Sequence, residues 1–235
     1  MNPAGLFPPG PHRFRLIGGR IDPGEYFLSR EPTGALLRER RRWLEEFPDR
    51  HAVLSPEGQE AWREFCSLVS GWNLPGGMPG RIIGEPRDAG GLLEPDILIL
   101  TADRAGDFRL RGGVLCFPTG WALTEAMGAT LDQIHAVVPG LNATMGGAIT
   151  RFLAGLKPGV AFGRDNWGIA ASGELNLHPA RGIAPPRLPV ELSSLWLRVE
   201  HQAFLALPRS PGVVFGIRVA LHRLDALAGT RIDRK

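Results

Sequence analysis

The last third of the sequence contains two segments in which every second side chain is apolar. In Val213–Leu221 the odd-numbered side chains are large and apolar, and most of the others are small or polar. Leu195–Gln202 alternates in the same way, and its more polar face carries Trp196, Arg198, Glu200 and Gln202. Successive side chains of a strand point to opposite faces, so this period of two predicts half-buried β-strands. The chain is therefore expected to build a sheet with one face on a hydrophobic core.

Three other segments have helical spacing. Leu36–Phe47 places its apolar side chains on one stripe and its arginines toward solvent. A second stripe runs from Ser55 to Gly71, and its opening Ser55-Pro56-Glu57 is typical of a helix start. Met145–Leu156 is the third predicted helix, and Lys157-Pro158-Gly159 would end it.

Shorter strands are expected between these helices. Ile97–Thr101 and Phe108–Phe117 are apolar runs joined by a polar segment that suits a hairpin loop. The glycine- and proline-rich residues Asn73–Gly91 are expected to form a long connection. This order of elements predicts an α+β fold with N-terminal helices and a largely antiparallel sheet.

The bulk composition is that of an ordinary globular protein. A chain of 235 residues can bury a sizeable core, and we expect one domain over residues 1–235, with residues 1–12 as a loose N-terminal arm. Met1–Pro11 lacks a signal-peptide pattern, and no apolar run approaches the ~20 residues that span a bilayer. We therefore expect a cytoplasmic protein that does not bind membranes. The net charge is only +3, and acids interleave with the arginines of residues 38–42, so nucleic-acid binding is not expected either.

Two cysteines and six histidines are the candidate metal ligands. Cys66 and Cys116 lack metal-ligand spacing and lie in apolar runs, so both are interpreted as buried core residues. A thiolate ligand is the alternative for Cys116. His135 follows Ile134 in an apolar setting just before the chain-breaking Pro139-Gly140. Neutral imidazole binds transition metals and moves protons near pH 7, although a hydrogen-bonded core histidine would have the same surroundings.

Four short sequence words follow one another in order. They are CFPTGW at 116–121, IHAVVPG at 134–140, RDNW at 164–167, and RVEHQ at 198–202 with a later Leu207-Pro208. In order and approximate spacing, the chain resembles the haem-dependent oxidative N-demethylase alpha-subunit family, which includes dimethylamine monooxygenase subunits. The resemblance covers roughly Phe14–Leu224, and its specificity lies in the ordered set.

Three positions depart from the family pattern. Thr119 stands where the family has Ser. Val137 replaces a Pro, which loosens the turn after His135 because Pro would fix φ there. His201 replaces an Arg, so a permanent cation gives way to a titratable group.

The resemblance implies a PAS-like fold that clasps haem b. It makes His135 the expected ligand of the haem iron, which needs a neutral ring nitrogen in an apolar setting. The residues expected to contact the cofactor are Trp121, Arg164, Asn166 and Trp167. The alternative for the two tryptophans is a role in the core. The alternative for Arg164 is a surface contact with Asp165.

The more polar face of Leu195–Gln202 is the expected catalytic site, although a solvated sheet face would have the same pattern. Glu200 would neutralise a protonated amine, since an amine must lose or share its proton before its α-carbon is oxidised. Arg198 would contact a propionate or orient Glu200, and Gln202 would hold polar ligand atoms.

The expected function is that of an oxygenase subunit that demethylates a small secondary amine with O2. No P-loop or dinucleotide fingerprint is present, so electrons are expected from a separate reductase that carries flavin and an iron–sulfur centre. Two alternatives remain open: a haem- or ligand-binding sensor without turnover, and a scaffold that has lost the cofactor.

Overall fold

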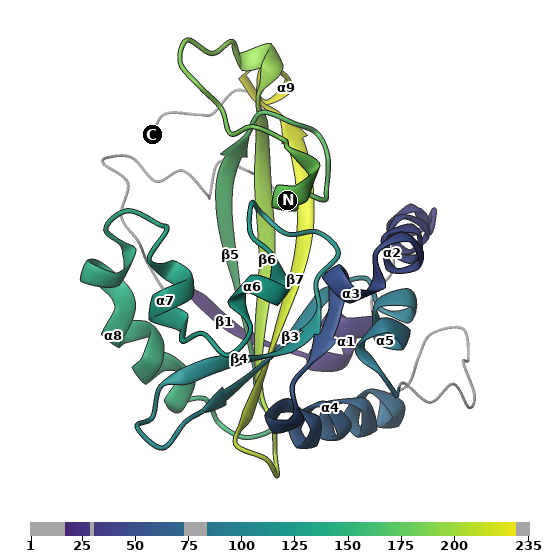
Figure 1. The fold of residues 1–235 in the computed structure, drawn as a ribbon, viewed down its shortest axis with the longest axis vertical. Helices are drawn as coiled ribbons and strands as arrows, with labels where there is room; N and C mark the ends of the chain where they lie inside the picture. Colours follow the sequence, from purple (N-terminus) through teal and green to yellow (C-terminus); the bar gives the residue numbers. More distant parts are fainter. Residues whose placement is uncertain (1–16, 29–30, 73–83, 229–235) are drawn as a thin grey trace.

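A seven-stranded antiparallel sheet forms the centre of the molecule (Figure 1). The structure is a computed structural model that describes residues 17–28, 31–72 and 84–228. The strands lie in the order β1-β5-β6-β7-β3-β4-β2. Their bounds are β1 Gly18–Ile21, β2 Ala52–Leu54, β3 Asp96–Ala102, β4 Phe108–Val114, β5 Ala161–Ala170, β6 Trp196–Ala206 and β7 Gly212–Arg223. The predicted α+β class with a largely antiparallel sheet is confirmed. The predicted N-terminal arm, residues 1–12, lies outside the described residues.

The two strands predicted from alternation form the longest pair of the sheet. β6 and β7 are antiparallel neighbours, with Phe204 opposite Phe215 and their rings stacked at 4.6 Å. Both strands are longer than predicted: β6 continues to Ala206 because its last four residues are apolar and buried, and β7 gains one residue at its start and two at its end. The sheet therefore extends the face that carries Arg198, Glu200 and Gln202.

Helices cover both faces of the sheet (Figure 1). Alternate residues of β3 enter two different cores: Ile97 and Ile99 join one, Leu98 and Leu100 the other. The first core lies under the helices α1 Pro23–Leu28, α2 Ala35–Glu46, α4 Gln59–Gly71 and α5 Pro86–Leu92. The second lies under α6 Leu123–Ala126, α7 Leu131–His135 and α8 Leu141–Ala154. The remaining α-helices of the described residues are the short α3 Pro48–His51 and α9 Leu224–Ala228.

Several predicted bounds are wrong for physical reasons. The connection predicted at Asn73–Gly91 contains the start of α5, because Glu85 and Asp88 form a capping box around Pro86; its residues 73–83 lie outside the described ranges. The strand predicted at Phe108–Phe117 ends at Val114, after Gly112 and Gly113 with φ of 126° and 134°.

Two further elements differ from the sequence prediction. α8 begins at Leu141, four residues before the predicted start, because Gly140 adopts a left-handed φ of 75° and turns the chain into it. The predicted helix after Ser55 opens with a 3-10 turn, Pro56–Gly58, before α4.

A buried ion pair fixes the chain just after β4. Arg40 donates to Asp96 at 2.6 Å, and both side chains are fully buried. The Asp96 carboxylate also accepts from the backbone N–H groups of Cys116 (2.6 Å) and Phe117 (3.0 Å). These bonds turn the chain sharply at the end of β4 and place the loop of Pro118 and Thr119 over the sheet.

Within the described ranges, no helix has both the length and the apolar character needed to cross a bilayer.

Candidate functional site

Polar side chains from two neighbouring strands meet on the face that α6, α7 and α8 cover. β5 pairs with β6 so that Asn166 lies opposite Glu200 and Arg164 opposite Gln202. Paired residues point to the same face, so these side chains lie beside the predicted catalytic row. We call the following five residues the polar cluster: Thr119, Asn166, Arg198, Glu200 and Gln202.

Glu200 is the centre of the polar cluster. Its Oε1 accepts from the Thr119 hydroxyl at 2.7 Å. Its Oε2 accepts from the Gln202 amide at 2.9 Å and from the Asn166 amide at 3.3 Å. Both oxygens are therefore held, while the residue is only half-buried. A carboxylate offers about four lone-pair positions, so Glu200 retains capacity for one further donor.

Arg198 is the most deeply buried member of the polar cluster, with 1% of its surface exposed. Its Nε donates to Thr119 Oγ1 at 2.8 Å, and its Nη2 donates to the Phe117 carbonyl at 2.7 Å. Nη1 reaches the Glu174 carbonyl at 3.4 Å. Burial lowers the pKa of Arg198, and the charge of Glu200 opposes that shift. These contacts support the expectation that Arg198 orients Glu200 more than the expectation that it meets a propionate.

The polar cluster is buried on one side and open on the other. Gln202 is buried, as is Arg198, whereas Asn166 and Thr119 are exposed. Thr119 is the member whose role the sequence did not reveal. Its position inside the CFPTGW word is the sequence signal that this residue matters.

His135 ends α7 in front of this face. A capping box between Thr130 and Gln133 starts this short helix, which ends at His135. Burial lowers the pKa of His135; the charge of Asp132 opposes this and that of Arg164 adds to it. The imidazole is therefore neutral at pH 7. Its Nδ1 is buried and has no hydrogen-bond partner in the described structure.

Arg164 lies opposite Gln202 in the register, on the same sheet face as the polar cluster. Burial lowers its pKa, and the charges of Glu200 and Asp165 oppose this shift. Its charge acts on His135 in turn, so Arg164 lies close enough to both groups to interact electrostatically. Its Nε is buried without a partner in the part of the chain that the structure describes. A buried unpaired donor of this kind is rare in proteins and calls for an explanation.

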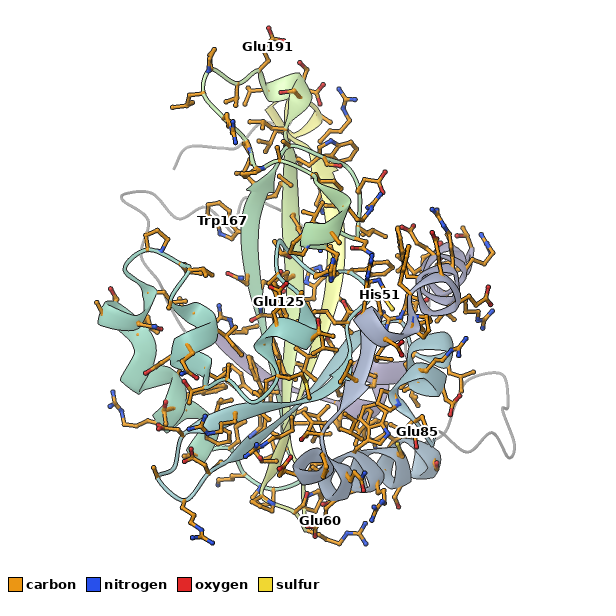
Figure 2. The ribbon with its side chains drawn as sticks, in the orientation of Figure 1. His51, Glu60, Glu85, Glu125, Trp167 and Glu191 are labelled. Carbon is orange, nitrogen blue, oxygen red and sulfur yellow. The ribbon has the colours of Figure 1, made fainter. Side chains whose placement is uncertain are left out.

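The two predicted tryptophans lie in different places. Trp121 packs against the core under α7 and α8, as does Ile134, so it shares a face with His135. Trp167 lies opposite Val199 in the register, on the other face of the sheet from Asn166, at the outer side of β5 (Figure 2). The structure therefore brings Trp121 toward the predicted site but does not bring Trp167 to it.

The two substituted family positions beside the site behave differently. His201 lies on the opposite face of β6 from Glu200, and its Nδ1 donates to Asp165 at 2.6 Å. Val137 is 81% exposed in the turn that follows His135. The change at 201 thus does not touch the polar cluster, whereas the change at 137 exposes apolar surface next to the predicted ligand.

Cys116 is buried, as predicted for a core residue. Burial raises the pKa of its thiol to about 12, against the opposing charge of Arg40. The thiol is therefore protonated at neutral pH, which argues against a thiolate ligand.

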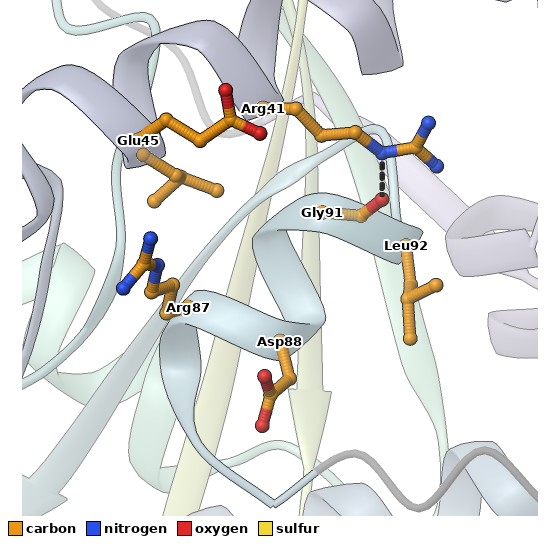
Figure 3. Close-up of a pocket in the computed structure, with 7 residues that line it drawn as sticks. Arg41, Glu45, Arg87, Asp88, Gly91 and Leu92 are labelled. Atoms are coloured by element: carbon orange, nitrogen blue, oxygen red, sulfur yellow. Dashed lines mark hydrogen bonds between the residues drawn. The ribbon is translucent and has the colours of Figure 1, made fainter.

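Two shallow surface pockets lie away from the polar cluster. The one in Figure 3 has a volume of about 330 Å³ between α2 and α5. Arg41 donates there to the Gly91 carbonyl at 2.9 Å, and Glu45, Arg87 and Asp88 add charges of both signs. The other pocket is lined by Glu60, Arg63, Glu64 and Arg209. Neither lining offers a side chain suited to ligate haem iron.

Two histidines outside the site, His51 and His178, are buried. His51 is packed against Trp43 and donates from Nδ1 to the Leu115 carbonyl at 2.7 Å. Its ring lies 5.7 Å from that of His178, edge to face. Burial lowers the pKa of both rings below the ordinary 6.5.

The free energy of unfolding should therefore fall as the pH drops below about 6.5. In that window the unfolded chain binds protons that the buried neutral rings of His51 and His178 do not, so acid favours unfolding. We expect the urea midpoint of the wild type to be lower at pH 5.5 than at pH 7.5, and His51→Asn to reduce that difference. An unchanged wild-type midpoint across this range would contradict the burial of neutral histidines.

Comparison with known protein families gives a match for the larger part of the chain. The family described as "Haem-dependent oxidative N-demethylase, alpha subunit-like" matches residues 87–233. This range contains His135, Arg164 and the whole polar cluster. It confirms the family predicted from the sequence words, while the N-terminal part of the predicted resemblance, from Phe14 on, falls outside the match. Since the match spans more than half of its residues, the chain belongs to the haem-dependent oxidative N-demethylase alpha-subunit-like family.

Proposed function

We propose that this chain is the oxygenase subunit of a haem-dependent oxidative N-demethylase acting on a small secondary amine. The observation that carries the proposal is a neutral, half-buried His135 whose buried Nδ1 has no partner among the described residues, beside the sheet face that carries Arg164 and Glu200. An alpha subunit works with other subunits, and we propose a separate reductase carrying flavin and an iron–sulfur centre as the electron donor.

We propose further that the chain is one domain and holds haem b in a PAS-like arrangement. His135 would ligate the iron, since a neutral imidazole with a free ring nitrogen is the form that binds. Arg164 would pair with a propionate, because its unpartnered Nε is a charge-assisted donor. Trp121 and the exposed Val137 would add apolar contact with the porphyrin. Asn166 points to the same face, whereas the position of Trp167 on the other face favours a role in packing.

The polar cluster supplies the amine-binding chemistry. Glu200 would hold the ammonium form of the substrate and accept its proton before oxidation. Gln202 and Asn166 hold Oε2 of that carboxylate, and Arg198 fixes the loop that covers it. Each of these groups acts on Glu200, so the cluster orients one base.

Haem, when bound, supplies the activation of O2. For each N-methyl group removed, one O2, two electrons and two protons would be consumed, and formaldehyde, water and the demethylated amine would be released. Electrons arrive from the reductase, and Glu200 provides a local site for the amine proton.

Glu200→Gln should weaken dimethylamine binding by roughly 10–100-fold, because it removes the charge that pairs with the ammonium group. Haem content should stay nearly unchanged, since Glu200 does not contact His135 directly. Isothermal titration of the haem-loaded protein measures the first quantity and the pyridine haemochromogen spectrum the second. Glu191→Gln, an exposed carboxylate at the tip shown at the top of Figure 2, is the matched control. Equal affinities of Glu200→Gln and the wild type would remove Glu200 from the site.

Formaldehyde release tests the function itself. Haem-loaded protein, NADPH, a flavin and iron–sulfur reductase and dimethylamine are expected to yield formaldehyde and methylamine in equal amounts. Haem binding without formaldehyde would overturn the enzymatic proposal in favour of a sensor, and failure to bind haem would favour a scaffold.

A further inference from the structure

One hydroxyl group joins a buried cation to the central carboxylate of the polar cluster. Thr119 Oγ1 accepts from Arg198 Nε at 2.8 Å and donates to Glu200 Oε1 at 2.7 Å. A hydroxyl has one proton to give and lone pairs to receive, so both bonds form at once. Bonds in such a chain polarise one another, and both of these involve a charged partner.

The backbone around Thr119 is held as firmly as its side chain. The Leu177 N–H donates to the Pro118 carbonyl at 3.0 Å, and the Gly120 N–H donates to the Leu177 carbonyl at 3.1 Å. Thr119 and Leu177 thus form a parallel bridge. The hydroxyl is fixed by the chain on either side of it, although the residue is exposed.

Arg198 acts on Glu200 through this hydroxyl. The other guanidinium contacts of Arg198 go to backbone carbonyls, namely those of Phe117, Pro118 and Glu174. Among the described residues, no ion pair joins Arg198 and Glu200. Thr119 is therefore the link by which the buried cation orients the carboxylate.

We propose that Thr119 is a positioning residue that holds Glu200 in the orientation that binds the amine. The inference rests on the proposed role of Glu200. With Oε1 held by Thr119 and Oε2 held by Gln202 and Asn166, the remaining lone-pair position of Glu200 points to one place. An ammonium group that must meet that position loses affinity when the carboxylate rotates freely.

This role accounts for Thr at a position where the resemblance expects Ser. Both residues carry the hydroxyl that the two hydrogen bonds require. The β-branch of Thr adds a restriction of χ1, which holds the hydroxyl in one rotamer. The function of the position is therefore kept by either residue and lost with an apolar one.

The test is a double-mutant cycle in the haem-loaded full-length protein, with dimethylamine as the probe. Thr119→Val has the same shape without the hydroxyl, and it should weaken dimethylamine binding about tenfold, as for a lost hydrogen bond to a charged group. Thr119→Ser should bind within about twofold of the wild type. In the Glu200→Gln background, Thr119→Val should cause no further loss, because it acts only through Glu200. Thr124→Val, exposed on α6 and outside the polar cluster, should leave the affinity unchanged.

The outcomes distinguish a failure of the role proposed for Thr119 from a failure of the proposed function. A Thr119→Val protein with wild-type affinity, or a loss that adds fully to that of Glu200→Gln, would overturn the role of Thr119 while leaving Glu200 in place. Failure of Thr119→Ser to restore binding would also overturn it, because packing and not the hydroxyl would then be responsible. A wild-type protein that binds haem but not dimethylamine would overturn the proposed function, and this inference with it.

Discussion

His135→Ala is expected to yield protein with little or no haem. Removing residues that merely support a metal ligand already costs roughly 10–100-fold in metal affinity, so loss of the ligand itself should cost more. The ring is neutral and its Nδ1 is unpaired, so no other interaction in the described structure competes for that nitrogen. Haem content per chain, measured as the pyridine haemochromogen after purification with haem supplied, gives the result directly.

Free imidazole should partly restore haem binding to His135→Ala by entering the space of the missing ring. His201→Ala and His222→Ala are the controls, and both should retain haem. His201 is paired with Asp165 on the opposite face of β6, and His222 lies near the end of β7. Full haem occupancy and an unchanged spectrum in His135→Ala would contradict the assignment.

Asp96→Asn should lower the free energy of unfolding by roughly 3–5 kcal/mol, the usual cost of leaving one partner of a buried ion pair uncompensated. Arg40 would keep its charge in a site with no exposure, and the amide would no longer accept from both Cys116 and Phe117. Urea denaturation followed by tryptophan fluorescence measures the change.

Glu46→Gln provides the contrast for Asp96→Asn. Glu46 forms an exposed pair with Arg42 at 3.9 Å on the surface of α2, so its loss should change stability by less than about 0.5 kcal/mol. Similar effects of the two substitutions would show that the Arg40–Asp96 pair is not the anchor of the loop that carries Thr119.

The parts of the site that depend on a single strand could be predicted from the sequence. Alternation alone placed Arg198, Glu200 and Gln202 on one face, because the side-chain period of a strand is fixed by its backbone. It also separated His201 from them. Both the shared face of these three residues and the opposite face of His201 follow from β6 alone, without knowledge of the neighbouring strands.

The parts of the site that depend on strand pairing could not be predicted from the sequence. β5 contains Gly163, Gly168 and the adjacent Asp165 and Asn166, residues that are rare in strands, so its sequence pattern does not predict a strand. Its register with β6 nevertheless decides that Asn166 reaches Glu200 and that Arg164 lies beside Gln202. The register depends on both strands, so it cannot be predicted from the sequence pattern of either strand alone.

Contacts between segments that are far apart in the sequence could not be predicted either. Thr119 meets Arg198 and Glu200 only because Asp96 and Leu177 hold its loop over β6. The family words indicated that residues 116–121 and 198–202 both matter. They did not indicate that one hydroxyl connects them.

The most direct test of the account is the visible spectrum of the wild-type protein, purified with haem supplied and titrated with dimethylamine. The account predicts a Soret band of a histidine-ligated haem that shifts saturably as the amine binds beside Glu200. A protein without a Soret band, or one whose haem spectrum ignores dimethylamine at every concentration, would contradict it.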